Sequence, residues 1–254
     1  MPAEAAHDPI AHLFGHINGH EGRLGPWPTS THLVMSVLAS ALVLLVLVRF
    51  AGRMRARGGA HPQGALDNLL ESFVVFVRDE IVRPNMGPHA DHYAHFLLSV
   101  FFFILFGNLL GLVPCGASPT GNLSITAGLA LVTFAYGAFQ GVKAQGFGHY
   151  VKNLAPAGVP VFVLVLLYPI EIMGLVIKHL VLAVRLFANM VAGHLVIGIL
   201  LALPALMGVQ AVSVPAYGLA CGIVMLELFV AFLQAYVFTV LASLFIGAQV
   251  HPEH

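Results

Sequence analysis

The sequence predicts an all-α integral membrane protein with about five membrane passes. Apolar residues make up 59% of the 254 residues, and charged residues make up only 9%, against about 25% in soluble domains. The mean hydropathy is +0.90. Several apolar runs reach about 20 residues, the length of a helix that crosses a bilayer. This composition excludes an ordinary soluble enzyme, a disordered regulator and a nucleic-acid-binding protein, which would need a surplus of basic residues.

The N-terminal segment, residues 1–32, is polar and rich in histidine, so it is not expected to enter the membrane. The first span is expected at Leu33–Phe50, within a single membrane domain that covers residues 33–254. Basic residues favour the cytoplasmic end of a span, and four arginines lie at the end of this one: Arg49, Arg53, Arg55 and Arg57. The N-terminus is therefore predicted to lie outside.

Residues 61–92 repeat apolar side chains with a helical period and place charges on the other faces. This pattern favours an amphipathic helix at the cytoplasmic interface. Pro84 and Pro88 are expected to end it.

The second and third spans are expected at His95–Val113 and Leu123–Val142. An uncharged, turn-rich loop, Pro114–Gly121, separates them. The next loop contains Lys143 and Lys152, which again suits the cytoplasm.

Residues 159–250 hold two long apolar runs. Pro169 and Pro204 are expected to bound the first, a helix about 51 Å long at 1.5 Å per residue; Pro215 opens the second. The hydrocarbon core is only about 30 Å thick, so both helices are expected to form a steeply tilted hairpin held by a partner. Kinks are the alternative, at glycines such as Gly174, Gly193 and Gly222.

Four polar side chains share a narrow stripe of the first long helix. At about 100° per residue, Glu171, Lys178 and Asn189 fall within about 40° of Arg185. An intramembrane arginine costs about 2.5–3.5 kcal/mol on insertion scales, so a functional role is the first hypothesis. The stripe predicts an aqueous path or a charged partner surface, and internal salt bridges that only hold helices together are the alternative.

The second long helix carries Glu227 and Gln234 on one face, seven residues apart. Glu227 lies among apolar residues, where a carboxylate should be paired, hydrated or protonated. His194 is about 180° from Arg185 around the first helix, and in an antiparallel hairpin it could approach Glu227. For Asn189 and Gln234, hydrogen bonds between helices are the alternative function.

Two histidine series have spacings that could hold a metal on one helix face: His12, His16 and His20, and His89, His92 and His95. No carboxylate or cysteine completes either set, so solvated polar residues are favoured and neither a metal nor a cofactor is predicted. A Gly-rich phosphate loop is also missing, so no bound nucleotide is expected.

The stretch Leu180–Gly193 contains the pattern Arg185-Leu-Phe-x-Asn189-Met-x-x-Gly193 and closely resembles the signature of subunit a of the F-type ATP synthase membrane sector. Further matching features extend from about residue 60 to the end. They are Phe106-Gly-Asn108 through Pro114, Pro119-Thr-x-Asn122, Glu171 and Lys178 before the arginine, and Leu233-Gln234-Ala235.

The resemblance implies that Arg185 is the essential stator arginine facing a rotating c-ring, with Asn189 and Gln234 beside it. His194 and Glu227 would line the half-channel open to the outside; some family members exchange the acid and the histidine. Glu171 would lie toward the cytoplasmic half-channel, with Lys178 on the same stripe. Asn108 and Asn122 are interpreted as polar residues that pack helices. Some relatives carry an acid near the position of Gly111.

The resemblance further implies a non-catalytic subunit that couples proton flow to rotary ATP synthesis or hydrolysis. Its expected partners are c-ring subunits, a b-type peripheral stalk, the ATPase head through the complex, and the lipid bilayer, with no nucleic acid. The expected location is a bacterial inner membrane, with the C-terminus in the cytoplasm. Two other functions are weighed: a self-contained secondary ion transporter or channel, and a structural membrane scaffold.

Overall fold

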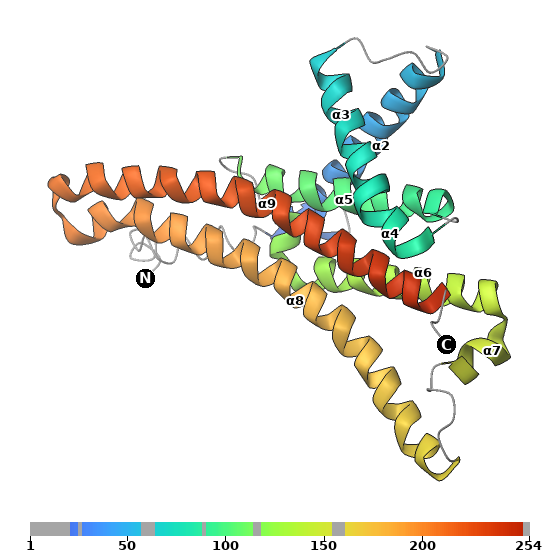
Figure 1. The fold of residues 1–254 in the computed structure, drawn as a ribbon. Coiled ribbons are helices and arrows are strands. Elements are labelled where there is room, and N and C mark those ends of the chain that lie inside the picture. The colour runs from blue at the N-terminus through green and yellow to red at the C-terminus, as the bar shows by residue number, and fades with distance from the viewer. Residues whose placement is uncertain are drawn as a thin grey trace. The chain divides into compact units, whose positions relative to one another are not determined.

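The computed structural model describes residues 21–24, 27–56, 64–87, 90–113, 118–153 and 161–250. Their elements in chain order are β1 (Glu21–Leu24), β2 (Trp27–Ser30), α2 (Thr31–Ala56), α3 (Ala65–Phe76), a π-helical segment (Val77–Val82), α4 (Arg83–Met86), α5 (Ala90–Gly111), a 3-10 turn (Pro119–Gly121), α6 (Leu123–Gln145), α7 (Phe147–Asn153), α8 (Val161–Met207), a second 3-10 turn (Gln210–Val212) and α9 (Ser213–Val250) (Figure 1).

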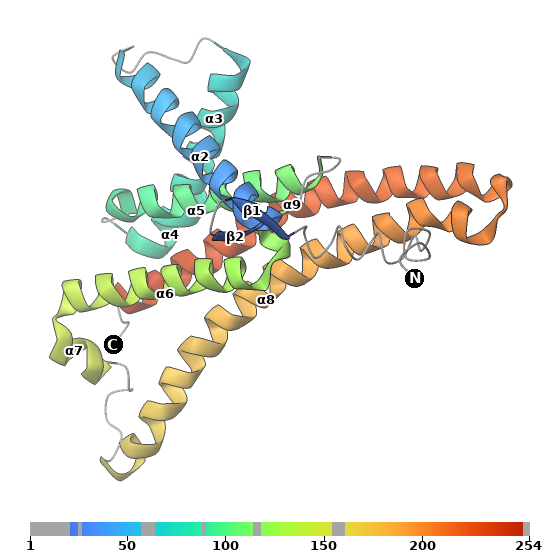
Figure 2. The ribbon, with the colours of Figure 1, turned by 180° about the vertical axis from the view of Figure 1, so that it is seen from behind.

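Among these elements, five helices are long and apolar enough to cross a membrane: α2, α5, α6, α8 and α9. The prediction of an all-α membrane protein with about five passes is confirmed. The exception is a small antiparallel hairpin in which β1 pairs with β2 in the register Glu21↔Ser30 (Figure 2). Its strands are only four residues long, so they do not change the fold class.

Three prolines that were expected to bound helices do not do so. Helix α8 begins at Val161 and runs through Pro169 and Pro204 to Met207, and Pro84 lies in the first turn of α4. A proline costs least in the first turn of a helix, where its missing N–H has no partner anyway. Inside a membrane helix, neighbouring groups can satisfy the carbonyl that a proline leaves free.

The long helices exceed the thickness of a bilayer by a wide margin. Helix α8 has 47 residues, so it is about 70 Å long, and α9, with 38 residues, is about 57 Å long. In the most apolar 18-residue stretch of α8 only 6% of the residues are buried, against 56% in α5. An apolar helix this exposed needs lipid or a partner against most of its surface.

The chain divides into two compact units built from interleaved segments. Unit 1 comprises Met1–Val43, Phe103–Thr126 and Arg185–Ala235, and unit 2 comprises Leu44–Phe102, Ala127–Val184 and Tyr236–His254. Each of the five long helices contributes residues to both units.

Unit 2 has an aromatic and aliphatic core. Phe73 of α3 lies edge-on to Phe102 of α5, with ring centroids 6.4 Å apart, and Asp67 of α3 forms a 2.8 Å ion pair with Arg53 of α2. The end of α9 packs closely on α6, since a Cβ atom at Gly137 would lie 3.3 Å from Ile246. These contacts join the amphipathic helix to two spans, while Leu66 and Leu69 on α3 stay exposed.

Candidate functional site

The site lies in unit 1, where the second half of α8 and the first half of α9 run antiparallel and side by side (Figure 1, Figure 2). The turn between them uses Gly208, whose φ of 64° favours glycine. Its N–H donates to the carbonyl oxygen of Pro204 at 3.1 Å, which ends α8. A hairpin of this kind brings residues that are far apart in sequence into contact.

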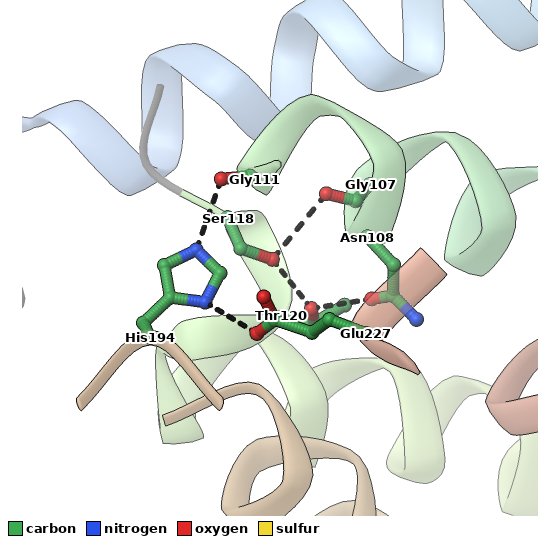
Figure 3. A network of polar contacts seen from close by, with 7 residues as sticks. All are labelled: Gly107, Asn108, Gly111, Ser118, Thr120, His194 and Glu227. Atoms are coloured by element: carbon green, nitrogen blue, oxygen red, sulfur yellow. Dashed lines mark hydrogen bonds and ion pairs between the residues drawn. The ribbon is translucent and has the colours of Figure 1, made fainter. Parts of the chain in front are cut away.

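His194 of α8 meets Glu227 of α9 inside this hairpin. The Nδ1 atom of His194 lies 3.0 Å from Oε1 of Glu227, and its Nε2 atom lies 3.0 Å from the carbonyl oxygen of Gly111 at the end of α5 (Figure 3). The Glu227 side chain is only 6% exposed. The expectation that the two residues approach each other across the hairpin is confirmed, and the imidazole is held at both nitrogens.

Two glycines make room for this pair. A Cβ atom at Gly193 would collide with the carboxyl group of Glu227. A Cβ atom at Gly111 would lie 2.5 Å from Cβ of Ser118 and 2.8 Å from Cε of Met190. The absence of a side chain at these positions lets α9 and the 118–121 turn approach the backbone of α8 and α5.

A second polar network borders the pair at Gly111. Ser118 Oγ donates to the carbonyl oxygen of Gly107 at 3.3 Å and lies 2.7 Å from Thr120 Oγ1. Thr120 Oγ1 donates to Oδ1 of Asn108 at 2.6 Å (Figure 3). Nδ2 of Asn108 donates to the carbonyl oxygen of Ala231 in α9 at 3.4 Å. These side chains are almost fully buried, so their hydrogen bonds hold the end of α5 against the turn and α9.

Sequence reasoning did not single out His32 in the first turn of α2. This residue is 4% exposed, and its Nδ1 atom lies 2.8 Å from the carbonyl oxygen of Ser118. Ser118 was also missed, although Thr120 belongs to the matched motif at Pro119. A histidine with a backbone partner carries no sequence signal, because a carbonyl oxygen exists at every residue.

Asn189 and Gln234 are also brought together, with Nδ2 of Asn189 donating to Oε1 of Gln234 at 2.8 Å. Gln234 is buried, whereas Asn189 and Arg185 are exposed on α8. Among the described residues no carboxylate forms an ion pair with Arg185. The exposed surface continues past Arg185 on one side of the helix, here called the arginine stripe: Arg185, Ala188, Asn189, Ala192, Val196 and Ile199.

The other candidate residues lie apart from this cluster. Glu171 is half-buried and Lys178 is exposed on the part of α8 that belongs to unit 2, and neither forms an ion pair within the described part of the chain. Asn122 caps α6: its Oδ1 accepts from the N–H of Ser124 at 2.9 Å. Of the two histidine series, His12, His16, His20 and His89 lie outside the described residues.

The fold and the site together define a multi-pass helical membrane protein. It displays a permanent cation on one side of a long helix and holds an acid–imidazole pair on the other. The family described as ATP synthase A chain matches residues 33–247. The chain belongs to this family.

Individual relatives support the same family assignment. ATP synthase subunit a of Myxococcus xanthus is 46% identical over 224 residues, which cover 88% of this chain and 73% of that relative. Subunit a of Anaeromyxobacter dehalogenans is 46% identical over 231 residues, 89% of this chain but 59% of that relative. Subunit a of Chloroherpeton thalassium is 38% identical over 88% of this chain and 67% of that relative. The chain thus spans less than two thirds of the length of the Anaeromyxobacter protein.

Proposed function

We propose that Arg185 and the His194–Glu227 pair carry two separate steps of proton transfer in the membrane sector of a rotary ATP synthase. As a member of its family, the chain is a non-catalytic bacterial membrane subunit that works with a c-ring and a b-type stalk in proton-coupled ATP synthesis. Within that complex, Arg185 would control the charge of the ring carboxylate, and the pair would deliver protons to it.

Arg185 carries the proposal, because it is a cation that cannot lose its proton in a protein. It is exposed on α8 and lacks a carboxylate partner in the described part of the chain. A permanent charge in apolar surroundings needs an anion. A carboxylate on a passing ring subunit supplies one, and the cation in turn favours the ionised form of that carboxylate. The ring carboxylate would therefore release its proton near Arg185, and a ring subunit that is still protonated could not move past this arginine.

The arginine stripe is the surface that we assign to the ring. Alanines at positions 188 and 192 leave little side-chain bulk beside Arg185 and Asn189, so that another helix can approach closely. Gln234 holds Asn189 by a hydrogen bond, which fixes the polar side of the stripe. As the c-ring rotates past this surface, each of its subunits in turn would meet the same positive charge.

We assign His194 and Glu227 to the half-channel that opens outside, with Asn108 and Thr120 beside them, and Glu171 and Lys178 to the cytoplasmic half-channel. The orientation rests on the arginines at the end of α2, which favour the cytoplasm. The N-terminus then lies outside and the C-terminus inside. Each proton that crosses down the membrane potential releases about 2.3 kcal/mol of free energy per 100 mV.

Reconstitution into proteoliposomes distinguishes this function from that of a self-contained transporter or channel. The chain with its c-ring should conduct protons down an imposed potential, whereas the chain without the ring should not. Conduction by the chain alone would favour the transporter.

A further inference from the structure

The carbonyl group of Gly111 determines which nitrogen of His194 is protonated. It lies 3.0 Å from Nε2 of His194, and a carbonyl oxygen can only accept a hydrogen bond. Nε2 must therefore be the donor, and it keeps its hydrogen whether the imidazole is neutral or positively charged. Only Nδ1, 3.0 Å from Oε1 of Glu227, is left to gain or lose a proton.

We propose that Glu227 alone passes protons along the path. His194 is a side arm, that is, a group beside the path that takes one proton from Glu227 and returns it. This inference rests on the proposed proton path. When the proton moves from Oε1 of Glu227 to Nδ1 of His194, one O–H bond breaks as one N–H bond forms. A neutral pair becomes a carboxylate and an imidazolium, and the reverse transfer restores it. No proton leaves the pair through His194, because Nε2 faces a carbonyl oxygen that cannot take one.

The second carboxyl oxygen of Glu227 is then the point at which protons enter and leave. Oε2 is buried and has no hydrogen-bond partner among the described residues. Buried polar atoms in native proteins nearly always have a partner, often an ordered water. A donor to Oε2 is therefore expected, and a water molecule is the donor that a proton path supplies.

The surrounding backbone makes this arrangement specific. Gly111 would clash with Ser118 and Met190 if it carried a side chain. Ser118 is held in turn by Gly107, Thr120 and His32. The carbonyl oxygen that orients His194 thus belongs to a segment fixed by several hydrogen bonds, so the imidazole cannot easily rotate to present Nε2 elsewhere.

Nitrogen NMR of ¹⁵N-histidine in the intact complex in lipid tests the protonation state directly. A His194→Gln variant assigns the signal. We expect Nε2 to be protonated at every pH tested, and only Nδ1 to change its protonation as the pH is varied. A bare Nε2 would overturn the inference.

Passive proton flux through vesicles stripped of the ATPase head tests the consequence. We expect Glu227→Gln to lower flux by about a hundredfold or more, the usual contribution of an acid–base group, and His194→Gln by about tenfold at most. Equal losses would mean that protons pass through both residues in series and would refute the side-arm role. If no preparation conducts protons, the proposed function fails, while the NMR result still decides the protonation state.

Discussion

Gly193 of α8 lies directly against the carboxyl group of Glu227, so closely that a Cβ atom there would collide with it. Gly193→Ala should therefore displace the carboxyl group of Glu227 from its place in the proton path and lower proton flux by about tenfold or more, since misplacing a reacting group by about 1 Å can cost a hundredfold. Passive flux in stripped vesicles is the measurement. Gly222→Ala is the matched control, because it also lies in the hairpin and a Cβ atom there meets nothing within 4 Å. Wild-type flux in Gly193→Ala would mean that the close approach has no effect on transfer.

Arg185→Ala should abolish ATP-driven proton pumping and at the same time permit passive leak. Without the cation, nothing holds the ring carboxylate ionised, and a protonated ring site can pass between the half-channels. Paired measurements of ATP-driven acidification and of conductance in stripped vesicles check both effects.

Arg185→Lys separates the two effects of the arginine. Lysine keeps a charge but can lose its proton when buried and lacks the delocalised guanidinium. We expect coupled activity to be lost with less leak than in the alanine variant. Near-normal pumping by Arg185→Ala would favour the scaffold function instead.

Glu227→Leu should slow proton flux strongly, by about a hundredfold or more, because the acid–base group is removed. Glu227→Asp keeps the carboxyl group but shortens the side chain, so its contact with His194, 3.0 Å in the native protein, lengthens and part of the flux remains. Rates of vesicle acidification under an imposed potential compare the two variants. Equal flux in both would reduce Glu227 to a residue that only packs helices.

Thr120→Val should destabilise the chain by about 1–3 kcal/mol, the usual cost of a buried group that loses its partner. The change removes the donor to Asn108 Oδ1 and the contact with Ser118. The midpoint of thermal unfolding of the solubilised complex measures it. Thr133→Val is the control, since that buried hydroxyl donates to the carbonyl oxygen of Leu129 in its own helix. Equal shifts in the two variants would mean that the network adds nothing beyond one local hydrogen bond.

Single cysteines at Ser30 and His254, in a background without Cys115 and Cys221, test the orientation. Ser30→Cys should react with an impermeant reagent added outside and His254→Cys only after the membrane is opened, since an odd number of passes separates them. Labelling of both from one side would contradict five passes.

Several features of this protein are determined by its sequence alone. Hydropathy predicts the five spans, because an apolar run of sufficient length has few alternatives to a membrane helix. Helical geometry places Arg185 and Asn189 on one stripe and His194 on the opposite side, because about 100° per residue holds in any α-helix. Helix ends are harder to predict: Pro169 and Pro204 do not bound α8, since a membrane helix can tolerate proline where neighbouring groups satisfy the backbone.

The tertiary structure decided which groups meet. The sequence allows a contact of His194 with Glu227. Whether the two side chains meet depends on how closely α8 and α9 approach at Gly193. The partners at Gly111 and Ser118 are backbone carbonyl groups, which every residue carries, so no residue pattern marks them. A periodic pattern fixes the face of a helix, whereas packing between helices decides what that face touches.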